Sequence, residues 1–140
     1  MGSRRTSREL AIRALFQTDV GRFKPEEALE SVLDPDRYAS VTLDFARELV
    51  MGVAEHLPHI DQMIEEYARG WTLDRMANVD RNVLRVAVFE LLYLPDVPPS
   101  VTVAEAVELA KQYSTAESGR FVNGILGSFV RNLDSELARS

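Results

Sequence analysis

Four arginines and one phenylalanine near the N-terminus are the side chains of this protein best suited to binding chemistry. They are Arg4, Arg5, Arg8, Arg13 and Phe16. A guanidinium pairs with phosphate and also stacks on bases, while an aromatic ring offers a surface on which a base can stack. At about 100° per residue along a helix, Phe16 falls on the same side as Arg5. This spacing indicates either a ring within an RNA surface or a ring covered by arginine stems.

The charge of this segment is opposite to that of the rest of the chain. Residues 1–24 hold six Lys or Arg side chains against two acids, a net charge of +4, whereas the 140-residue chain has a net charge of −6. Cations gathered in one terminal helix of an acidic protein suit a polyanionic partner. We therefore predict an RNA-binding arm at the N-terminus.

A second candidate surface lies at the start of the last predicted helix. Arg120, Phe121 and Asn123 supply a cation, a ring and an amide near a helix N-terminus, where anions are also favoured. The same segment contains three poor helix formers, Gly119, Gly124 and Gly127. Two interpretations stay open: close helix packing through Gly124 and Gly127 with Phe121 in the core, or a second contact with RNA.

Residues for catalysis, metal binding or cofactor binding are not evident. The chain has no cysteine, which excludes disulfides and cysteine-based metal or redox sites. Pro58 interrupts the helical geometry that would place His56 and His59 on one face, so we expect no metal site. A Gly-rich phosphate loop, a nucleophile elbow and a Ser/His/Asp set are also missing. We therefore expect a binding protein rather than an enzyme, without a cofactor.

Several acids could form a surface of their own in the second half of the chain. They are Asp74, Asp80, Glu90, Glu105 and Glu108. We expect them to be a solvated acidic surface, or equally a docking face for a basic partner.

Helical periodicity extends along the whole chain, and no segment of useful length alternates with period two. We expect helices at roughly 7–20, 25–33, 41–55, 58–69, 76–94, 101–113 and 118–137. Three capping pairs support helix starts: Thr6 with Glu9, Thr102 with Glu105, and Ser114 with Glu117.

One of these segments should be the centre of the fold. Residues 83–94 are apolar on nearly every side, which is typical of a buried helix in an all-α domain. We predict an all-α fold of about seven helices in two packed bundles around this helix. Residues 1–140 would form a single domain with an N-terminal part at about 4–70 and a C-terminal part at about 71–138. Trp71, at a helix end, is expected in the core.

The cellular compartment follows from what the sequence lacks. No apolar run reaches the ~18 residues of a membrane-spanning helix, and the N-terminus lacks a secretory apolar region. We expect a cytoplasmic protein without a membrane partner.

An ordered set of motifs resembles the NusB family of bacterial transcription antitermination factors. The motifs are Arg-Arg-x-x-Arg-Glu-x-Ala at 4–11, Ala14-Leu15-Phe16-Gln17, Leu49-Val50-x-Gly52-Val53, Val79-Asp80-Arg81-x-x-Leu84-Arg85-x-Ala87-x-x-Glu90-Leu91, Asp96-Val97-Pro98, Val103-x-Glu105-Ala106-Val107-Glu108-Leu109-Ala110-Lys111 and Phe121-Val122-Asn123-Gly124-Ile125-Leu126. Each motif is weak alone, but the ordered set, from residue 4 to about 130, is highly specific.

The resemblance implies a function as well as an all-α fold of two bundles. It implies binding to the boxA sequence of nascent single-stranded RNA together with NusE, a small-subunit ribosomal protein. The pair would help RNA polymerase resist termination, notably on ribosomal RNA operons. The positions that match the family's RNA surface are Arg4, Arg5, Arg8, Phe16, Lys111, Arg120, Phe121 and Asn123. Asp74 and Asp80 match its partner-docking region.

Two other interpretations stay open. Similar helical domains precede the catalytic domain of a family of RNA cytosine methyltransferases, so the chain could be such a targeting module. The lack of a Gly-rich cofactor loop and of a cysteine nucleophile argues against that. The other interpretation is a protein that does not bind RNA and instead binds a partner through its acidic face or associates with itself. Some members of the resembled family are dimers, and the sequence leaves open whether this chain forms a homodimer.

Overall fold

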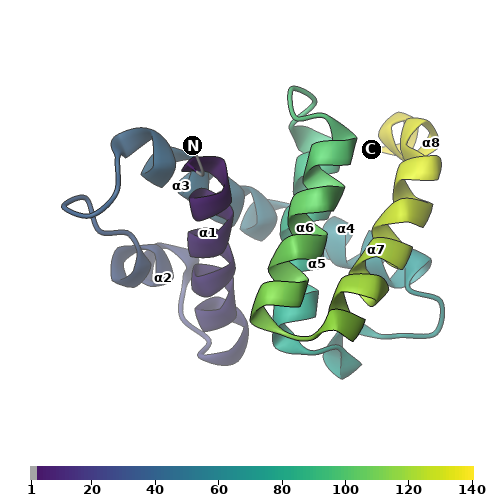
Figure 1. Cartoon of the computed structure of the whole chain (residues 1–140), viewed down its shortest axis with the longest axis horizontal. Helices are drawn as coiled ribbons and strands as arrows, with labels where there is room; N and C mark the ends of the chain where they lie inside the picture. Colours follow the sequence, from purple (N-terminus) through teal and green to yellow (C-terminus); the bar gives the residue numbers. More distant parts are fainter. Residues whose placement is uncertain (1–2) are drawn as a thin grey trace.

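The computed structural model describes residues 3–140, and every regular element within them is helical (Figure 1). The α-helices are α1 (Ser3–Val20), α2 (Pro25–Val32), α3 (Ser40–Glu55), α4 (Leu57–Tyr67), α5 (Asn78–Tyr93), α6 (Pro99–Tyr113), α7 (Ala116–Arg131) and α8 (Leu133–Arg139), and the 3-10 turn η1 (Leu73–Arg75) precedes α5. The predicted all-α class is confirmed. The last predicted helix is divided into α7 and α8 because the backbone leaves the helical conformation at Asn132 (φ −113°, ψ 16°).

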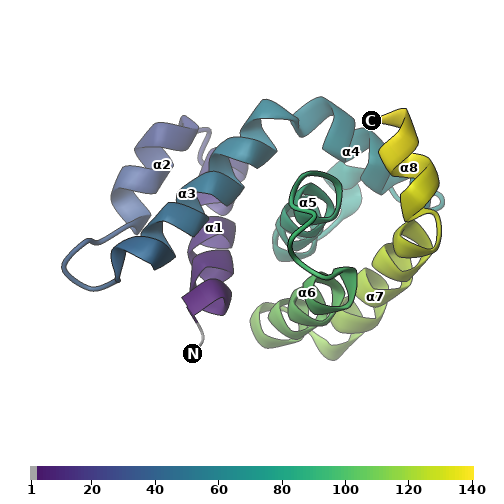
Figure 2. The same ribbon diagram turned by 90° about the horizontal axis from the view of Figure 1, so that it is seen from above.

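The predicted buried central helix is α5. Eleven of its sixteen residues are buried. Seen from above, α5 lies inside a ring formed by α4, α6, α7 and α8, with α1 to α3 on its other side (Figure 2). A helix that is apolar all round needs neighbours on every side, and this arrangement supplies them.

The remaining helices form two groups that meet on α5. In the first group, α1 packs on α2 and α3; in the second, α6 packs on α7 as an antiparallel pair. Helix α4 was expected in the N-terminal part, but it packs mainly on α5 and α7. The boundary near residue 70 stays a prediction, and this packing favours one closer to His56.

Close helix approach depends on two glycines. A Cβ atom at Gly52 of α3 would overlap the Phe89 ring of α5, and one at Gly119 of α7 would overlap the Lys111 stem of α6. Gly124 has nothing near its missing side chain, and Gly127 has only the end of the Arg131 side chain at 3.6 Å. The expectation of close packing through Gly124 and Gly127 was therefore wrong, and in this helix the close approach occurs at Gly119 instead.

The predicted capping pairs mostly do not mark helix starts. Thr6 and Thr102 lie inside α1 and α6 instead of preceding them. The cap of α7 is Thr115, one residue after the predicted Ser114, and its hydroxyl accepts from the backbone N–H of Ser118 at 3.0 Å. The motif was misplaced at α1 and α6 because both helices begin about one turn earlier than the polar pattern indicates.

Candidate nucleic-acid interface

Helices α1, α6 and α7 lie side by side on one face of the molecule (Figure 1). Long side chains connect the first two. The Arg5 side chain of α1 bonds to Glu105 of α6, and the Tyr113 hydroxyl of α6 donates to a Glu9 carboxylate oxygen of α1 at 2.7 Å. The pairs occur in the same order along both helices, so α1 and α6 run parallel. This face carries most of the predicted RNA-binding residues.

Arg5 is exposed at this face and is held in place by Glu105. Its Nε and one Nη donate to the two carboxylate oxygens at 2.8 and 2.7 Å, while 48% of the side chain remains exposed. The hydrogen bond from Arg5 holds the pKa of Glu105 below its usual range. A guanidinium has five N–H donors, so three remain for a further anion such as a phosphate.

Arg8 is not on this face, contrary to the expectation. It is 3% exposed, and its Nε and Nη2 donate to the Glu90 carboxylate of α5 at 2.8 and 2.7 Å. The Thr102 hydroxyl of α6 also donates to Glu90, at 3.2 Å. Arg8 lies three and seven residues before Ala11 and Leu15, so it shares their inward stripe. Glu90, expected in a solvated surface, is 1% exposed and belongs to the same buried pair.

Arg4 lies at the junction of α1 with α3. Its guanidinium carbon is 4.1 Å from the centroid of the Phe45 ring, a cation–π contact that leaves the residue exposed. Of Arg4, Arg5 and Arg8, only the first two therefore reach solvent.

Phe16 is 41% exposed, so it is not the covered core residue of the alternative interpretation. Ile12, which lies one turn before Phe16 on the same side of the helix, is 7% exposed and belongs to the core. Residues of α5 and α6, among them Ala87 and Leu109, lie around Ile12 and cover this part of α1.

Two further residues of this face were not among the predicted RNA-binding positions. Arg13 is exposed, and Tyr113 is 50% exposed. The hydrogen bond to Glu9 raises the pKa of Tyr113, and Arg13 is close enough to oppose that rise. Arg13 was counted among the cations but not assigned a role, and Tyr113 follows Lys111 by two residues at the end of the matching motif.

The α6–α7 part of the face contains the other predicted residues. Lys111, Arg120 and Asn123 are exposed, and the stem of Lys111 crosses Gly119. Phe121 is half-buried, and its ring meets the edge of Trp71 with centroids 5.5 Å apart. Trp71 was expected in the core, but it is 46% exposed: it lies in the loop between α4 and η1, where its ring contacts are with Phe121 and Arg75.

The two predicted docking acids have different surroundings. Asp74, in η1, is exposed. Asp80 is 7% exposed, so it is not part of a solvated surface. Its Oδ2 accepts from the Ser118 hydroxyl at 3.1 Å, its Oδ1 has no hydrogen-bond partner among the described residues, and burial raises its pKa. Asp80 lines a cavity of about 310 Å³ together with Trp71 and Phe121.

Metal-ligand clusters are not found among residues 3–140. The His56 ring stacks on the Tyr93 ring with centroids 4.1 Å apart. A ring nitrogen of His59 is hydrogen-bonded to the Ser140 hydroxyl at 3.0 Å. In the part of the chain that the structure describes, no helix is long and apolar enough to cross a membrane.

Two helical groups around one buried helix, with cations and rings on a shared outer face, define a small all-α domain equipped for binding. The model of the NusB family matches residues 5–131, so the chain belongs to the NusB family. It is 51% identical to the transcription antitermination protein NusB of Symbiobacterium thermophilum, over 94% of this chain and 91% of that protein. It is 47% identical to the protein of that name from Desulforamulus reducens, over 94% and 92% of the two chains.

Solved structures share the fold. The chain superposes on T. maritima NusB with a TM-score of 0.86 and 43% identity, covering 91% of this chain and 90% of that one. It also superposes on a chain from a crystal structure of antitermination factors NusB and NusE in complex with dsRNA, with a TM-score of 0.85, 30% identity, and coverage of 94% and 98%.

Proposed function

We propose that the protein is a transcription antitermination adaptor that binds boxA RNA jointly with the ribosomal protein NusE and performs no catalysis. The observation that carries the RNA part is the α1–α6–α7 face, where exposed cations and rings gather on a protein whose net charge is −6. The similarity to a NusB chain solved with NusE and dsRNA supports the two partners. The adaptor would act in the cytoplasm on nascent RNA and support readthrough by RNA polymerase, notably in ribosomal RNA operons.

Each group on the face has a role in this proposal. Arg4, Arg5 and Arg13 pair with phosphates, because their guanidinium groups reach solvent. Phe16 and Tyr113 offer rings for stacking bases. Arg8 does not contact RNA; its buried ion pair with Glu90 holds α1 against α5.

The α6–α7 end continues the same surface. Lys111 and Arg120 supply cations there, Phe121 supplies a partly exposed ring, and Asn123 supplies an amide that can read a base edge. Asp74, on the adjoining turn, is the exposed acid for the basic NusE, and Asp80 lies in the cavity beside it.

The test is RNA binding with and without NusE. The variant R4A/R5A removes two exposed cations of the face, and R37A/R47A removes two exposed arginines of the α2–α3 region as a matched control. Because each phosphate contact releases counterions, R4A/R5A should reduce the slope of log affinity against log salt by roughly 1.4, whereas the control should leave it unchanged. Equal effects of the two variants, or no effect of NusE, would contradict the proposal.

The alternative of a methyltransferase targeting module is not favoured. The chain extends over 91% and 92% of two relatives that are named as antitermination proteins.

A further inference from the structure

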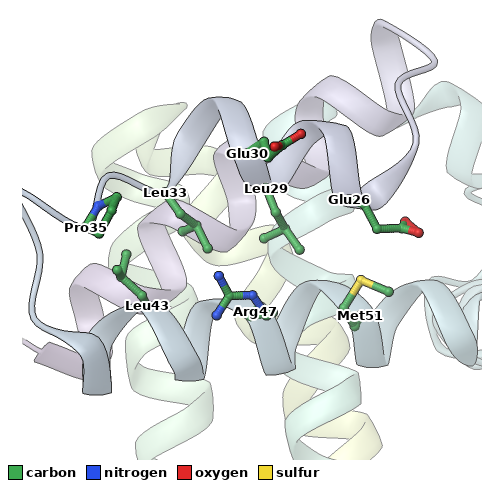
Figure 3. A pocket seen from close by; sticks show the side chains of 8 residues that line it. All are labelled: Glu26, Leu29, Glu30, Leu33, Pro35, Leu43, Arg47 and Met51. Atoms are coloured by element: carbon green, nitrogen blue, oxygen red, sulfur yellow. The ribbon is translucent and has the colours of Figure 1, made fainter.

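A groove between α2 and α3 has no role in the proposed function. It has a volume of about 410 Å³. Helix α2, which forms one wall of the groove, lies on the side of α1 opposite to α6 and α7 (Figure 1). Leu29 and Leu33 of α2 line it together with Leu43 and Met51 of α3, and Figure 3 shows these side chains facing one another across the groove. Glu26 and Glu30 lie on its α2 side.

The chain leaves this groove open because α2 and α3 both pack on α1 more extensively than on each other. Residues 33–39 connect them as an irregular segment, in which Pro35 lines one end of the groove. Met51 is 37% exposed, and its flexible thioether can adapt to different apolar side chains. The groove is therefore apolar at its base and accessible from solvent.

The charge around the groove is strongly negative. Residues 25–55 contain eight acids and two arginines, a net charge of −6 that equals the charge of the whole chain. Neither Glu26 nor Glu30 forms an ion pair within the described residues. Arg47 of α3 also lines the groove, and its charge is paired with Asp44 at 3.5 Å. This potential repels RNA and attracts a cationic partner.

We propose that the α2–α3 groove binds a basic, amphipathic helical segment of a partner protein. Leucine-like side chains three and four positions apart would enter between Leu33 and Met51, and Lys or Arg side chains would meet Glu26 and Glu30. Helix α2 has eight residues and is about 12 Å long, so the groove accommodates roughly two turns of a partner helix. This site is separate from the RNA face and does not depend on the proposed function.

The probe is a fluorescein-labelled helical peptide of about four turns, with leucines three and four positions apart and lysines elsewhere. Fluorescence anisotropy measures its binding to the whole protein. The variant E26K/E30K reverses the groove acids, and D96K/D134K makes the same charge change at exposed acids outside residues 25–55. We expect E26K/E30K to weaken binding about tenfold and the control to weaken it much less.

Two further measurements separate the proposal from general charge attraction. A peptide with serine in place of leucine should lose binding, and amide resonances of α2 and α3 should shift when the leucine peptide is added. Equal losses for the two charge variants, or shifts spread over the whole surface, overturn the proposal. Sedimentation of the protein alone provides the last test: self-association that E26K/E30K abolishes would make a second copy the occupant and would also overturn it.

Discussion

Arg8 of α1 and Glu90 of α5 form a bidentate ion pair at 2.8 and 2.7 Å in the interior, with side-chain exposures of 4% and 1%. This pair joins the first helical group to the central helix. Arg8 belongs to the same arginine-rich segment as Arg5, yet it serves the fold while its neighbour faces solvent.

Replacing Arg8 with alanine should destabilise the protein strongly. The change leaves the Glu90 carboxylate buried without its counterion, which costs about 3–5 kcal/mol in the free energy of unfolding. Urea denaturation measures this loss. The control R8M/E90L replaces the pair by apolar side chains and should recover most of the stability. A normal stability of R8A with weaker RNA binding would instead place Arg8 at the RNA surface.

Replacing Glu105 with glutamine should strengthen RNA binding. The substitution removes the negative charge that neutralises Arg5. An RNA phosphate then no longer competes with the Glu105 carboxylate for the Arg5 guanidinium. We expect roughly threefold tighter binding at low salt, measured by filter binding or anisotropy. E55Q, which removes an exposed acid on α3, is the control for net charge. The gain should disappear in R5A/E105Q, and a gain that persists there would show that Arg5 is not involved.

Replacing Phe16 with alanine should weaken RNA binding without loss of stability. An exposed ring that stacks on a base contributes about 1–3 kcal/mol to binding, while its exposure limits its contribution to the core. Isothermal titration with RNA and thermal unfolding measure the two effects. V41A, at a residue 67% exposed on α3, should change neither. A large fall in melting temperature for F16A would assign the ring to packing.

Alanine substitutions at two glycines should have opposite effects on stability. At Gly52 the new Cβ overlaps the Phe89 ring, and forcing α3 and α5 apart costs about 1–3 kcal/mol. At Gly124 the Cβ meets nothing, so alanine should stabilise α7 by about 0.5–1 kcal/mol through its better helix propensity. Chemical denaturation of both variants tests the packing, and destabilisation by G124A would indicate an unseen contact.

Replacing Asp80 with asparagine should stabilise the protein at neutral pH. Burial raises the pKa of Asp80 above its ordinary value of 3.8, so the folded state binds this proton more tightly than the unfolded state. The resulting penalty is absent below pH 3.8 and grows as the pH rises through the folded-state pKa. Unfolding free energies at pH 7, 5 and 3.5 should therefore show an advantage of D80N that shrinks with acidity. An advantage independent of pH would exclude this explanation.

The central helix and the exposed ring illustrate what local patterns can predict. An apolar run such as 83–94 admits only a buried position, and α5 occupies it. Phe16 could be placed among charged residues because helical spacing alone decides which residues of one helix lie on the same side. Trp71 could not be placed, since its exposure depends on how the loop after α4 lies against Phe121.

The sequence by itself therefore determined the helical class, the buried central helix, the charge separation and the membership of a family through ordered motifs. Only the tertiary structure decided which arginines face solvent. Arg5 and Arg8 have the same chemistry and lie three residues apart, but Glu105 and Glu90 hold them in an exposed and a buried position. Those acids lie 100 and 82 residues away along the chain, and only helix packing brings them to α1.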